Sequence, residues 1–200
     1  MGKVVMYSSV SVDGFVASFA GHYAFDGRPA MVAVGMDDQV LPVVHGFPAR
    51  LIVPGLYGYT SATKWLQTID VSDRTDLPGF WASRGWAPAV EVHVMSRIDS
   101  PHGSLSAGTV SIAGVAWAPT AGVGSVEVRV DDGPWQQAEL SRRYSGVLWR
   151  QWALPWQATR GTHRLTARAT DAAGRMQDTT VRDVYPSGAT GLHTVTVTVR

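Results

Sequence analysis

Six segments between residues 90 and 200 alternate apolar and polar side chains and follow one another at nearly even spacing. They span residues 90–98, 108–118, 124–132, 146–154, 163–171 and 193–200. Val126, Val128 and Val130 share one face of such a segment, because successive side chains of a strand point to opposite faces. Turn signals such as Asp131-Asp132-Gly133 separate the segments. The pattern predicts an antiparallel β-sandwich of about 100 residues, which is the immunoglobulin-like size.

The first ninety residues are less regular. Residues 3–17 begin with β-branched and aromatic side chains and reach an Asp-Gly turn signal, which predicts a strand entering a turn. Residues 31–55 predict short strands joined by turns. Residues 60–69 predict a short helix with its first Thr or Ser as N-cap. Residues 70–86 are rich in turn formers and predict a linker or surface loop with two aromatic anchors.

The charge balance and hydropathy exclude several classes of partner. The formal net charge is +1, and because no basic block is longer than two residues we expect no nucleic-acid surface. No apolar run reaches the length of about 20 residues that a membrane-spanning helix needs. The first residues also lack the plan of a signal peptide. We therefore expect a soluble chain, cytoplasmic by default.

The sequence contains no cysteine. This excludes disulfides, thiolate metal sites and cysteine nucleophiles among these residues. The histidines form no i, i+4 pair and have no acidic neighbours at metal-ligand spacing, so no metal site is predicted. Ser8, Ser9 and Ser11 lack the G-x-S-x-G setting of a hydrolase nucleophile. The tryptophans after residue 116 are interpreted as sandwich core and rim rather than as a stacking platform for sugars or bases.

Residues 45–65 combine the parts of an anion-binding cradle. Arg50 offers a planar fork of donors that suits phosphate or carboxylate, and Lys64 adds a compact positive charge. The Gly-, Ser- and Thr-rich loop between them allows backbone N–H groups to approach an anion. His45 adds an imidazole. Spacing alone leaves an alternative open, in which His45 caps a turn, Arg50 pairs with a surface acid and the glycines form turns.

The run HGFPARLIVPGLYGYTSATKWL, residues 45–66, resembles the end of the molybdopterin-binding domain of the sulfite oxidase family, where HGFPxRxxVPG precedes a KWL element. Downstream segments such as GTVSIAGVAWAP and VEVRVDDGPWQQAEL resemble that family's C-terminal dimerisation domain, an immunoglobulin-like β-sandwich. The resemblance covers residues 26–200. The molybdopterin contacts that it implies are His45, Arg50, Ala62, Thr63 and Lys64.

The resemblance also implies an organisation and a function. The chain is mainly β: a strand-like segment (1–18), an α+β fragment of the molybdopterin-binding domain (19–78) and an immunoglobulin-like dimerisation domain (79–200). The family carries molybdenum-molybdopterin, whose metal is also held by one protein cysteine, and performs oxygen-atom transfer. Because that cysteine is absent, we expect the chain to form one wall of the site, and not to turn over sulfite alone. We also expect a companion chain that supplies the missing cofactor half, and a homodimer through the C-terminal domain.

Residues 2–17 resemble a second family. GKVVMYSSVSVDGFVA is similar to the opening strand of the dihydrofolate reductase-like family, which includes the reductase domain of riboflavin biosynthesis. Besides the oxidoreductase, two other functions stay open. One is a β-sandwich that dimerises or docks without a cofactor, and the other is an NADPH-dependent dihydrofolate reductase-like protein.

Overall fold

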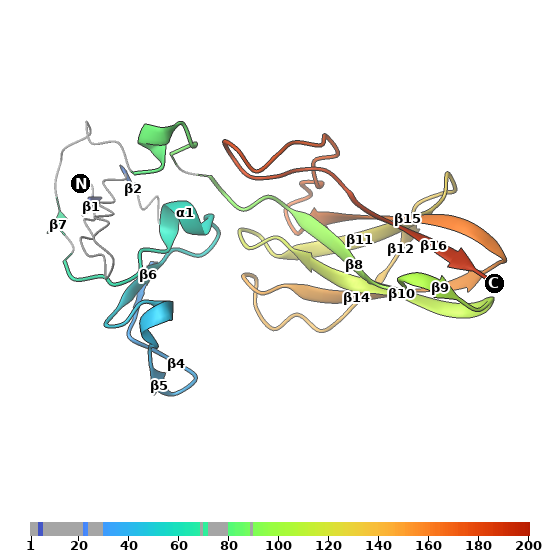
Figure 1. The fold of residues 1–200 in the computed structure, drawn as a ribbon, viewed down its shortest axis with the longest axis horizontal. Coiled ribbons are helices and arrows are strands. Elements are labelled where there is room, and N and C mark those ends of the chain that lie inside the picture. Colours follow the sequence, from blue (N-terminus) through green and yellow to red (C-terminus); the bar gives the residue numbers. More distant parts are fainter. Residues whose placement is uncertain (1–3, 6–21, 24–29, 69, 72–79, 89) are drawn as a thin grey trace. The chain divides into compact units, whose positions relative to one another are not determined.

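A computed structural model describes residues 4–5, 22–23, 30–68, 70–71, 80–88 and 90–200. The chain forms two compact units, whose ribbons are drawn in Figure 1. The first unit comprises Met1–Glu91 with Tyr185–Ser187, and the second comprises Val92–Val184 with Gly188–Arg200. Each unit has its own hydrophobic core.

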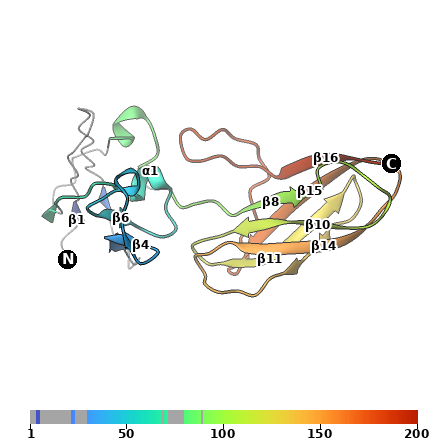
Figure 2. The same cartoon turned by 60° about the horizontal axis from the view of Figure 1, so that its bottom comes forward.

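Two sheets packed face to face build the second unit (Figures 1 and 2). One sheet has the strand order β13-β14-β10-β8, and the other has the order β12-β11-β15-β16-β9. Paired strands are antiparallel except for β16 and β9, which run parallel. The strands are β8 (Met95–Ser100), β9 (Gly103–Leu105), β10 (Gly108–Trp117), β11 (Val123–Val130), β12 (Gln136–Gln137), β13 (Glu139–Leu140), β14 (Arg150–Ala158), β15 (Gly161–Asp171) and β16 (His193–Val199). The predicted mainly β sandwich is confirmed.

Apolar side chains from both sheets fill the space between them. Val126 and Val128 of β11 are fully buried, and Ile112 and Trp152 of the opposite sheet belong to the same cluster. Each buried Val or Ile side chain stabilises the fold by about 1.5–3 kcal/mol. The predicted apolar face of β11 is confirmed, although Val130 at its end is only partly buried.

Two predicted strands have different bounds in the structure. The strand predicted at 90–98 corresponds to β8 and the strand predicted at 146–154 corresponds to β14, and both begin and end later than predicted. Before β14, the indole N–H of Trp117 donates to the carbonyl of Val147 at 2.8 Å. The Val147 carbonyl therefore bonds to a side chain and not to a neighbouring strand, and the residues just before β14 form a loop.

The tryptophans of the second unit divide between core and rim, as predicted. Trp152 lies in the core with 2% of its surface exposed, whereas Trp149 is 62% exposed. Trp135 lies beside two guanidinium groups, because the central carbons of Arg129 and Arg168 are 4.9 and 4.1 Å from its ring centre. Such cation–π contacts stabilise a partly exposed indole.

The described residues of the first unit form three small sheets. β1 pairs with β2 and β7, β3 pairs with β6, and β4 pairs with β5. Leu51, Val53 and Leu66 form the buried core. The elements are β1 (Val4–Val5), β2 (His22–Tyr23), β3 (Met31–Ala33), β4 (Gly35–Met36), β5 (Gln39–Val40), η1 (Val43–His45), β6 (Arg50–Ile52), α1 (Gly58–Ser61), β7 (Asp70–Val71) and η2 (Ala82–Arg84).

The helix predicted at 60–69 is wrong in position and length. α1 begins earlier and ends at Ser61. Trp65 has a left-handed backbone with a φ of 53°, which a right-handed helix excludes. No helix within the described ranges is both long enough and apolar enough to cross a membrane.

The remaining predictions for the first unit are met only in part by described residues. β1 lies within the strand predicted at 3–17, and the other residues of that segment lie outside the described part. Nearly all of the segment that resembles the dihydrofolate reductase-like family also lies outside it. In the loop predicted at 70–86, Trp81 and Trp86 pack edge to face with ring centroids 5.9 Å apart. Trp86 also packs against Tyr59 at 4.9 Å.

A close approach of two strands in the sandwich depends on Gly114 of β10. A methyl group here would overlap the carbonyl oxygen of Arg97 and would lie 2.8 Å from the indole of Trp152. The register between β10 and β8 shifts between Ala113 and Gly114. One obstacle is backbone and the other is a buried ring, so neither can move away easily.

The ring of His163 lies between two hydrogen-bond acceptors. Nδ1 is 2.9 Å from a carboxylate oxygen of Asp131, and Nε2 is 2.8 Å from the carbonyl of Thr159. Only the imidazolium form can donate to both. The bond to Asp131 raises the pKa of His163, and the backbone N–H of Arg164 that donates to Asp131 lowers the pKa of that carboxyl. The geometry and the charges therefore favour the protonated form of the ring.

We predict that Gly114→Val destabilises the second unit by about 2–4 kcal/mol, because overpacking at a rigid site costs at least about 1–3 kcal/mol. Denaturant unfolding followed by tryptophan fluorescence measures the change. Ser111→Val is the matched control, because Ser111 is exposed on the same strand, and it should stay within about 0.5 kcal/mol of wild type. Equal stability of the two variants would contradict the packing argument.

We predict that the stability difference between wild type and His163→Gln shrinks as pH rises above about 6.5. The folded pKa of His163 is raised, so its contribution is complete below the unfolded value and is lost as pH rises through the folded value. Free energies of unfolding of both proteins, measured between about pH 5.5 and 9, test this. A difference that does not change with pH would show that the ring is not charged.

Candidate functional site

Residues 42–50 form a tight loop that leads into β6. Pro42 precedes η1, and the helical turn ends at Gly46, whose φ of 115° lies in the left-handed region that glycine adopts readily. The Phe47-Pro48 peptide bond is cis. Arg50 is the first residue of β6. The HGFPAR sequence therefore turns the chain sharply between a helical turn and a strand.

A second loop, residues 62–66, is hydrogen-bonded to the first. The N–H of Leu51 donates to the carbonyl of Thr63 at 2.8 Å, and the N–H of Leu66 donates to the carbonyl of Ala49 at 2.7 Å. Leu51 and Leu66 are also core residues of this unit. The two loops are therefore fixed to each other and to one apolar base.

Three consecutive carbonyl groups of η1 accept hydrogen bonds from side chains. The pairs are Trp65 Nε1 with Val43 at 2.8 Å, Lys64 Nζ with Val44 at 2.9 Å, and Arg50 Nη1 with His45 at 3.4 Å. The last carbonyls of a helical turn carry partial negative charge, so cationic groups stabilise them. These three hydrogen bonds place the side chains of Arg50 and Lys64 at the same helical turn.

Gly46 lies between these two cationic side chains. A methyl group at Gly46 would lie 3.1 Å from Cβ of Arg50 and 3.1 Å from Cβ of Lys64. The backbone N–H of Trp65 donates to the Gly46 carbonyl at 3.2 Å. Any larger residue at this position would push the stems of Arg50 and Lys64 apart.

The structure brings most of the predicted contact residues to this place. His45 is exposed at the end of η1, and its carbonyl accepts the bond from Arg50. Lys64 lies across Gly46 from Arg50. Thr63 is buried, with 2% of its surface exposed, and takes part through its carbonyl. Ala62 stands apart, because its N–H closes α1.

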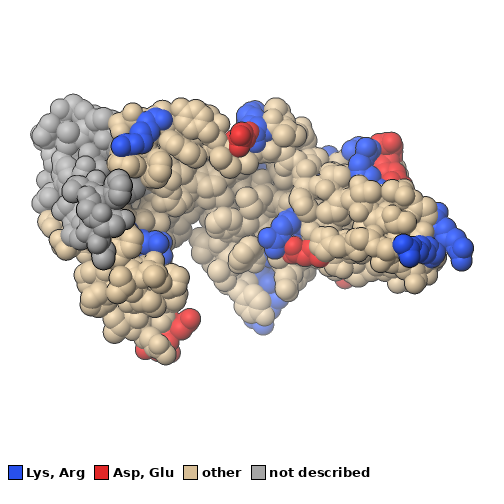
Figure 3. Space-filling model, viewed as in Figure 1, with Lys and Arg blue, Asp and Glu red and all other residues tan. Residues whose placement is uncertain are grey.

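The cluster carries two positive charges. Among the ion pairs between described residues, none involves Arg50 or Lys64. Nε of Arg50 is buried and has no hydrogen-bond partner in the part of the chain that the structure describes. An incompletely bonded guanidinium beside an ammonium group suits an anion. Elsewhere, on the face drawn in Figure 3, basic and acidic side chains are interspersed on a largely uncharged surface.

Two members of this arrangement are not among the contact residues predicted from the sequence. Gly46 belongs to the HGFPAR motif and is not a predicted contact, although a glycine directly after a short helical turn is a signal for a left-handed cap. Trp65 lies within the helix predicted at 60–69, whereas in the structure its indole donates to the first of the three η1 carbonyls. The carbonyl acceptors themselves carry no sequence signal, because every residue has one.

The donor set does not suit a metal ion. The chain has no cysteine. Within the described ranges, no group of three His, Asp or Glu side chains is arranged to hold a metal. The side chains that meet at Gly46 include two cations, which repel a metal and attract an anion. This site is therefore a candidate for binding an anionic group.

Comparisons with known proteins point to one family. The family model for the oxidoreductase molybdopterin binding domain matches residues 2–81. Human mitochondrial sulfite oxidase is 33% identical over 184 residues, which cover 78% of this chain and 33% of that protein. Sulfite oxidase from Arabidopsis thaliana is 28% identical over 187 residues, which cover 78% of this chain and 47% of that protein.

A solved structure shares the fold. The sulfane dehydrogenase SoxCD from Paracoccus pantotrophus aligns with a TM-score of 0.74 at 21% identity, covering 100% of this chain and 57% of that chain. The chain spans 33% of the length of the human and macaque sulfite oxidases that it matches. It belongs to the sulfite oxidase-like family of molybdopterin oxidoreductases.

Proposed function

We propose that this chain supplies the C-terminal part of a sulfite oxidase-like molybdopterin-dependent oxidoreductase. Its first unit contributes one wall of the cofactor site, and its second unit is a dimerisation domain. The observation that carries the proposal is the convergence of Arg50 and Lys64 on the two sides of Gly46. Molybdopterin ends in a phosphate, and a guanidinium with a neighbouring ammonium group binds phosphate well.

The proposed contacts use groups that the loops hold in place. Arg50 and Lys64 bind the phosphate, and His45 lies beside the cofactor at the exposed end of η1. A guanidinium has five N–H donors, and Arg50 uses one of them on the His45 carbonyl. It can therefore bind an anion and keep the loop bond. Ala62 and Thr63 precede Lys64 in the same loop, and we propose that they contact the cofactor through groups other than the Ala62 N–H, which α1 uses, and the Thr63 carbonyl, which Leu51 uses.

The residues present fit the anionic organic part of the cofactor and not its metal. When bound, the cofactor supplies the molybdenum at which the family transfers an oxygen atom. A soft thiolate ligand helps to set the properties of such a metal, and these residues include no cysteine. We infer that these residues bind and orient the pterin, that the thiolate ligand comes from outside them, and that they do not turn over sulfite alone.

The second unit carries an exposed aromatic surface. Tyr144 and Trp149 are 80% and 62% exposed, and large exposed apolar groups that lie together mark interaction sites. This surface supports the homodimer that we propose for the second unit. It also favours the second candidate function, a β-sandwich that dimerises or docks and binds no cofactor.

We predict that the chain, purified from cells that make molybdopterin, retains the pterin. Arg50→Ala and Lys64→Ala should each lower the retained pterin at least about tenfold, because losing a charge-assisted hydrogen bond costs about 1.5–3 kcal/mol. Fluorescence of the oxidised pterin measures its content, and elemental analysis of the same sample measures molybdenum.

Arg160→Ala is the matched control for these variants. Arg160 is an exposed arginine between β14 and β15, and its loss should leave the pterin content unchanged. Circular dichroism checks that each variant is folded. A wild-type chain that carries no pterin, or an equal loss in the control, would remove the cofactor proposal and leave the interaction module.

A further inference from the structure

The four-stranded sheet of the second unit ends in β8, which pairs with β10 along one side only. The polar backbone groups on the other side of an edge strand have no partner within their own sheet. Ile98 and Ser96 of β8 are nevertheless buried, with 1% and 6% of their surfaces exposed. Because a buried N–H without a partner is unfavourable, this edge of β8 needs partners from outside its sheet.

His193 supplies one of these partners. Its Nδ1 accepts a hydrogen bond from the backbone N–H of Ile98 at 3.0 Å. His193 is the first residue of β16, which belongs to the five-stranded sheet, so this bond joins the two sheets at one edge of the sandwich. A ring nitrogen that accepts carries no proton, so the imidazole is neutral and its proton is on Nε2. An imidazolium ring would instead turn an N–H group toward the N–H of Ile98.

Gln177 makes a second connection to β8. Its Oε1 accepts from the hydroxyl of Ser96 at 2.9 Å and from the N–H of Ala169 at 3.1 Å. Its Nε2 donates to the carbonyl of Gly191 at 2.9 Å. Gln177 is 5% exposed, and an amide side chain does not titrate. Of these two connections between β8 and the opposite sheet, the one through His193 can therefore respond to pH and the one through Gln177 cannot.

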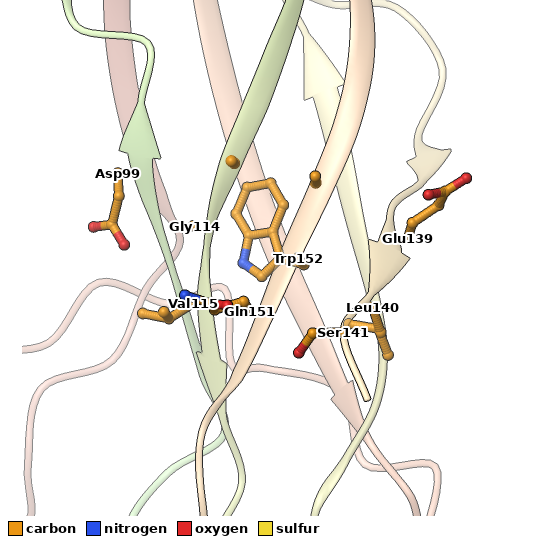
Figure 4. A pocket seen from close by; sticks show the side chains of 10 residues that line it. Asp99, Gly114, Val115, Glu139, Leu140, Ser141, Gln151 and Trp152 are labelled. Carbon is orange, nitrogen blue, oxygen red and sulfur yellow. The ribbon is translucent and has the colours of Figure 1, made fainter. Parts of the chain in front are cut away.

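The pairing of β8 with β10 is irregular next to Ile98. Ile98 pairs with Gly114 and Ser100 pairs with Ala113, so the register shifts and Asp99 is the extra residue. Figure 4 shows Asp99 on β8, the strand beside Gly114. A bulge of this kind interrupts the ladder of hydrogen bonds. The end of β8 from Ile98 to Ser100 is therefore the end that can open locally with the least loss of pairing.

The surroundings of His193 disfavour its charged form. Burial is the main cause that lowers the pKa of His193. Of the charged groups that face it from β8 and from the turn after β8, Arg97 and His102 also lower this pKa and Asp99 raises it. On β15 the residue opposite His193 is Ala167, which carries no charge. Once the edge opens, water reaches the ring, which then takes up a proton near its ordinary value of about 6.5.

We propose that His193 is an acid-sensitive latch that fastens the end of β8 to β16. At neutral pH the ring accepts the Ile98 N–H and the edge is closed. As pH falls below about 6.5, protons bind more tightly to the open form than to the closed form, so the ratio of open to closed rises by up to about tenfold per pH unit until the folded pKa is reached. Ser96 stays attached through Gln177. The sign is opposite to that of His163, whose contribution is lost as pH rises.

Amide hydrogen exchange of the full chain tests the latch. NMR follows it at pH values between about 7.5 and 5, with correction for the intrinsic pH dependence of exchange. Protection of the Ile98 amide should fall by up to about tenfold per pH unit below about 6.5. The Ala169 amide is the matched control within the same molecule, because it is a buried N–H bonded to a side chain that does not titrate. Equal changes at the two amides, or no change at Ile98, overturn the proposal.

Two variants identify the titrating group. His193→Asn keeps an acceptor at the position of Nδ1 that cannot gain a proton, so protection of Ile98 should become independent of pH. Asp99→Asn removes the carboxylate that raises the pKa of His193 and that pairs with Arg97 at 2.6 Å, so the fall should move to lower pH. A fall in His193→Asn equal to that of wild type overturns the proposal.

A measurement on the wild-type chain needs no substitution. The ¹⁵N chemical shifts of the His193 ring report which nitrogen carries the proton, and at pH 7.5 they should show an unprotonated Nδ1. Below about pH 6.5, the protonated ring should appear together with the loss of protection at Ile98. An Nδ1 that is already protonated at pH 7.5 overturns the latch even if a variant fails to fold.

Discussion

The packing of Trp152 against Gly114 is the contact on which the sandwich depends. No disulfide holds the two sheets together, so buried apolar area must. The indole N–H of Trp152 is buried without a partner among the described residues, which costs about 1–3 kcal/mol. Burying a Trp side chain removes about 150–250 Å² from water, which at about 25 cal/mol per Å² stabilises by about 4–6 kcal/mol. The gain from burial exceeds this cost, provided that the neighbouring strand β10 has no side chain at the position that pairs with Trp152.

Hydrogen bonds from charged side chains stabilise the site loop of the first unit, whereas buried apolar area stabilises the second unit. Its buried core is small, and the loop at 42–50 is held largely by side chains that donate to η1 carbonyls. Surface contacts of this kind are weak one by one, but here three of them meet at consecutive residues. The same cations that hold the loop are those that we propose bind the cofactor phosphate. An anion at Arg50 and Lys64 would neutralise their mutual repulsion, so binding and loop stability favour the same arrangement.

Much of the sandwich could be predicted from alternation, because period 2 with one buried face leaves few other folds. The start of β14 could not, since it depends on a bond from Trp117 that lies 30 residues away from its acceptor. At the site, motif spacing indicated that Arg50 and Lys64 converge. The helix prediction failed because Thr60 to Ile69 has helix-like spacing, while a long-range bond from Leu51 to Thr63 and the left-handed Trp65 favour a loop. A local sequence pattern carries no information about hydrogen-bond partners that lie far away along the chain.

The small residues of β10 and β14 have two separable causes. Gly114 points inward, where Trp152 and the Arg97 carbonyl leave no space. Ala113 and Ala153 point outward, where nothing in the core limits their size and β-branched residues would suit a central strand better by up to about 1 kcal/mol. The fold of a single chain explains the glycine and not the alanines. It also leaves Trp149 exposed at an energetic cost. Both features lie on the second unit, which is the unit that we propose dimerises.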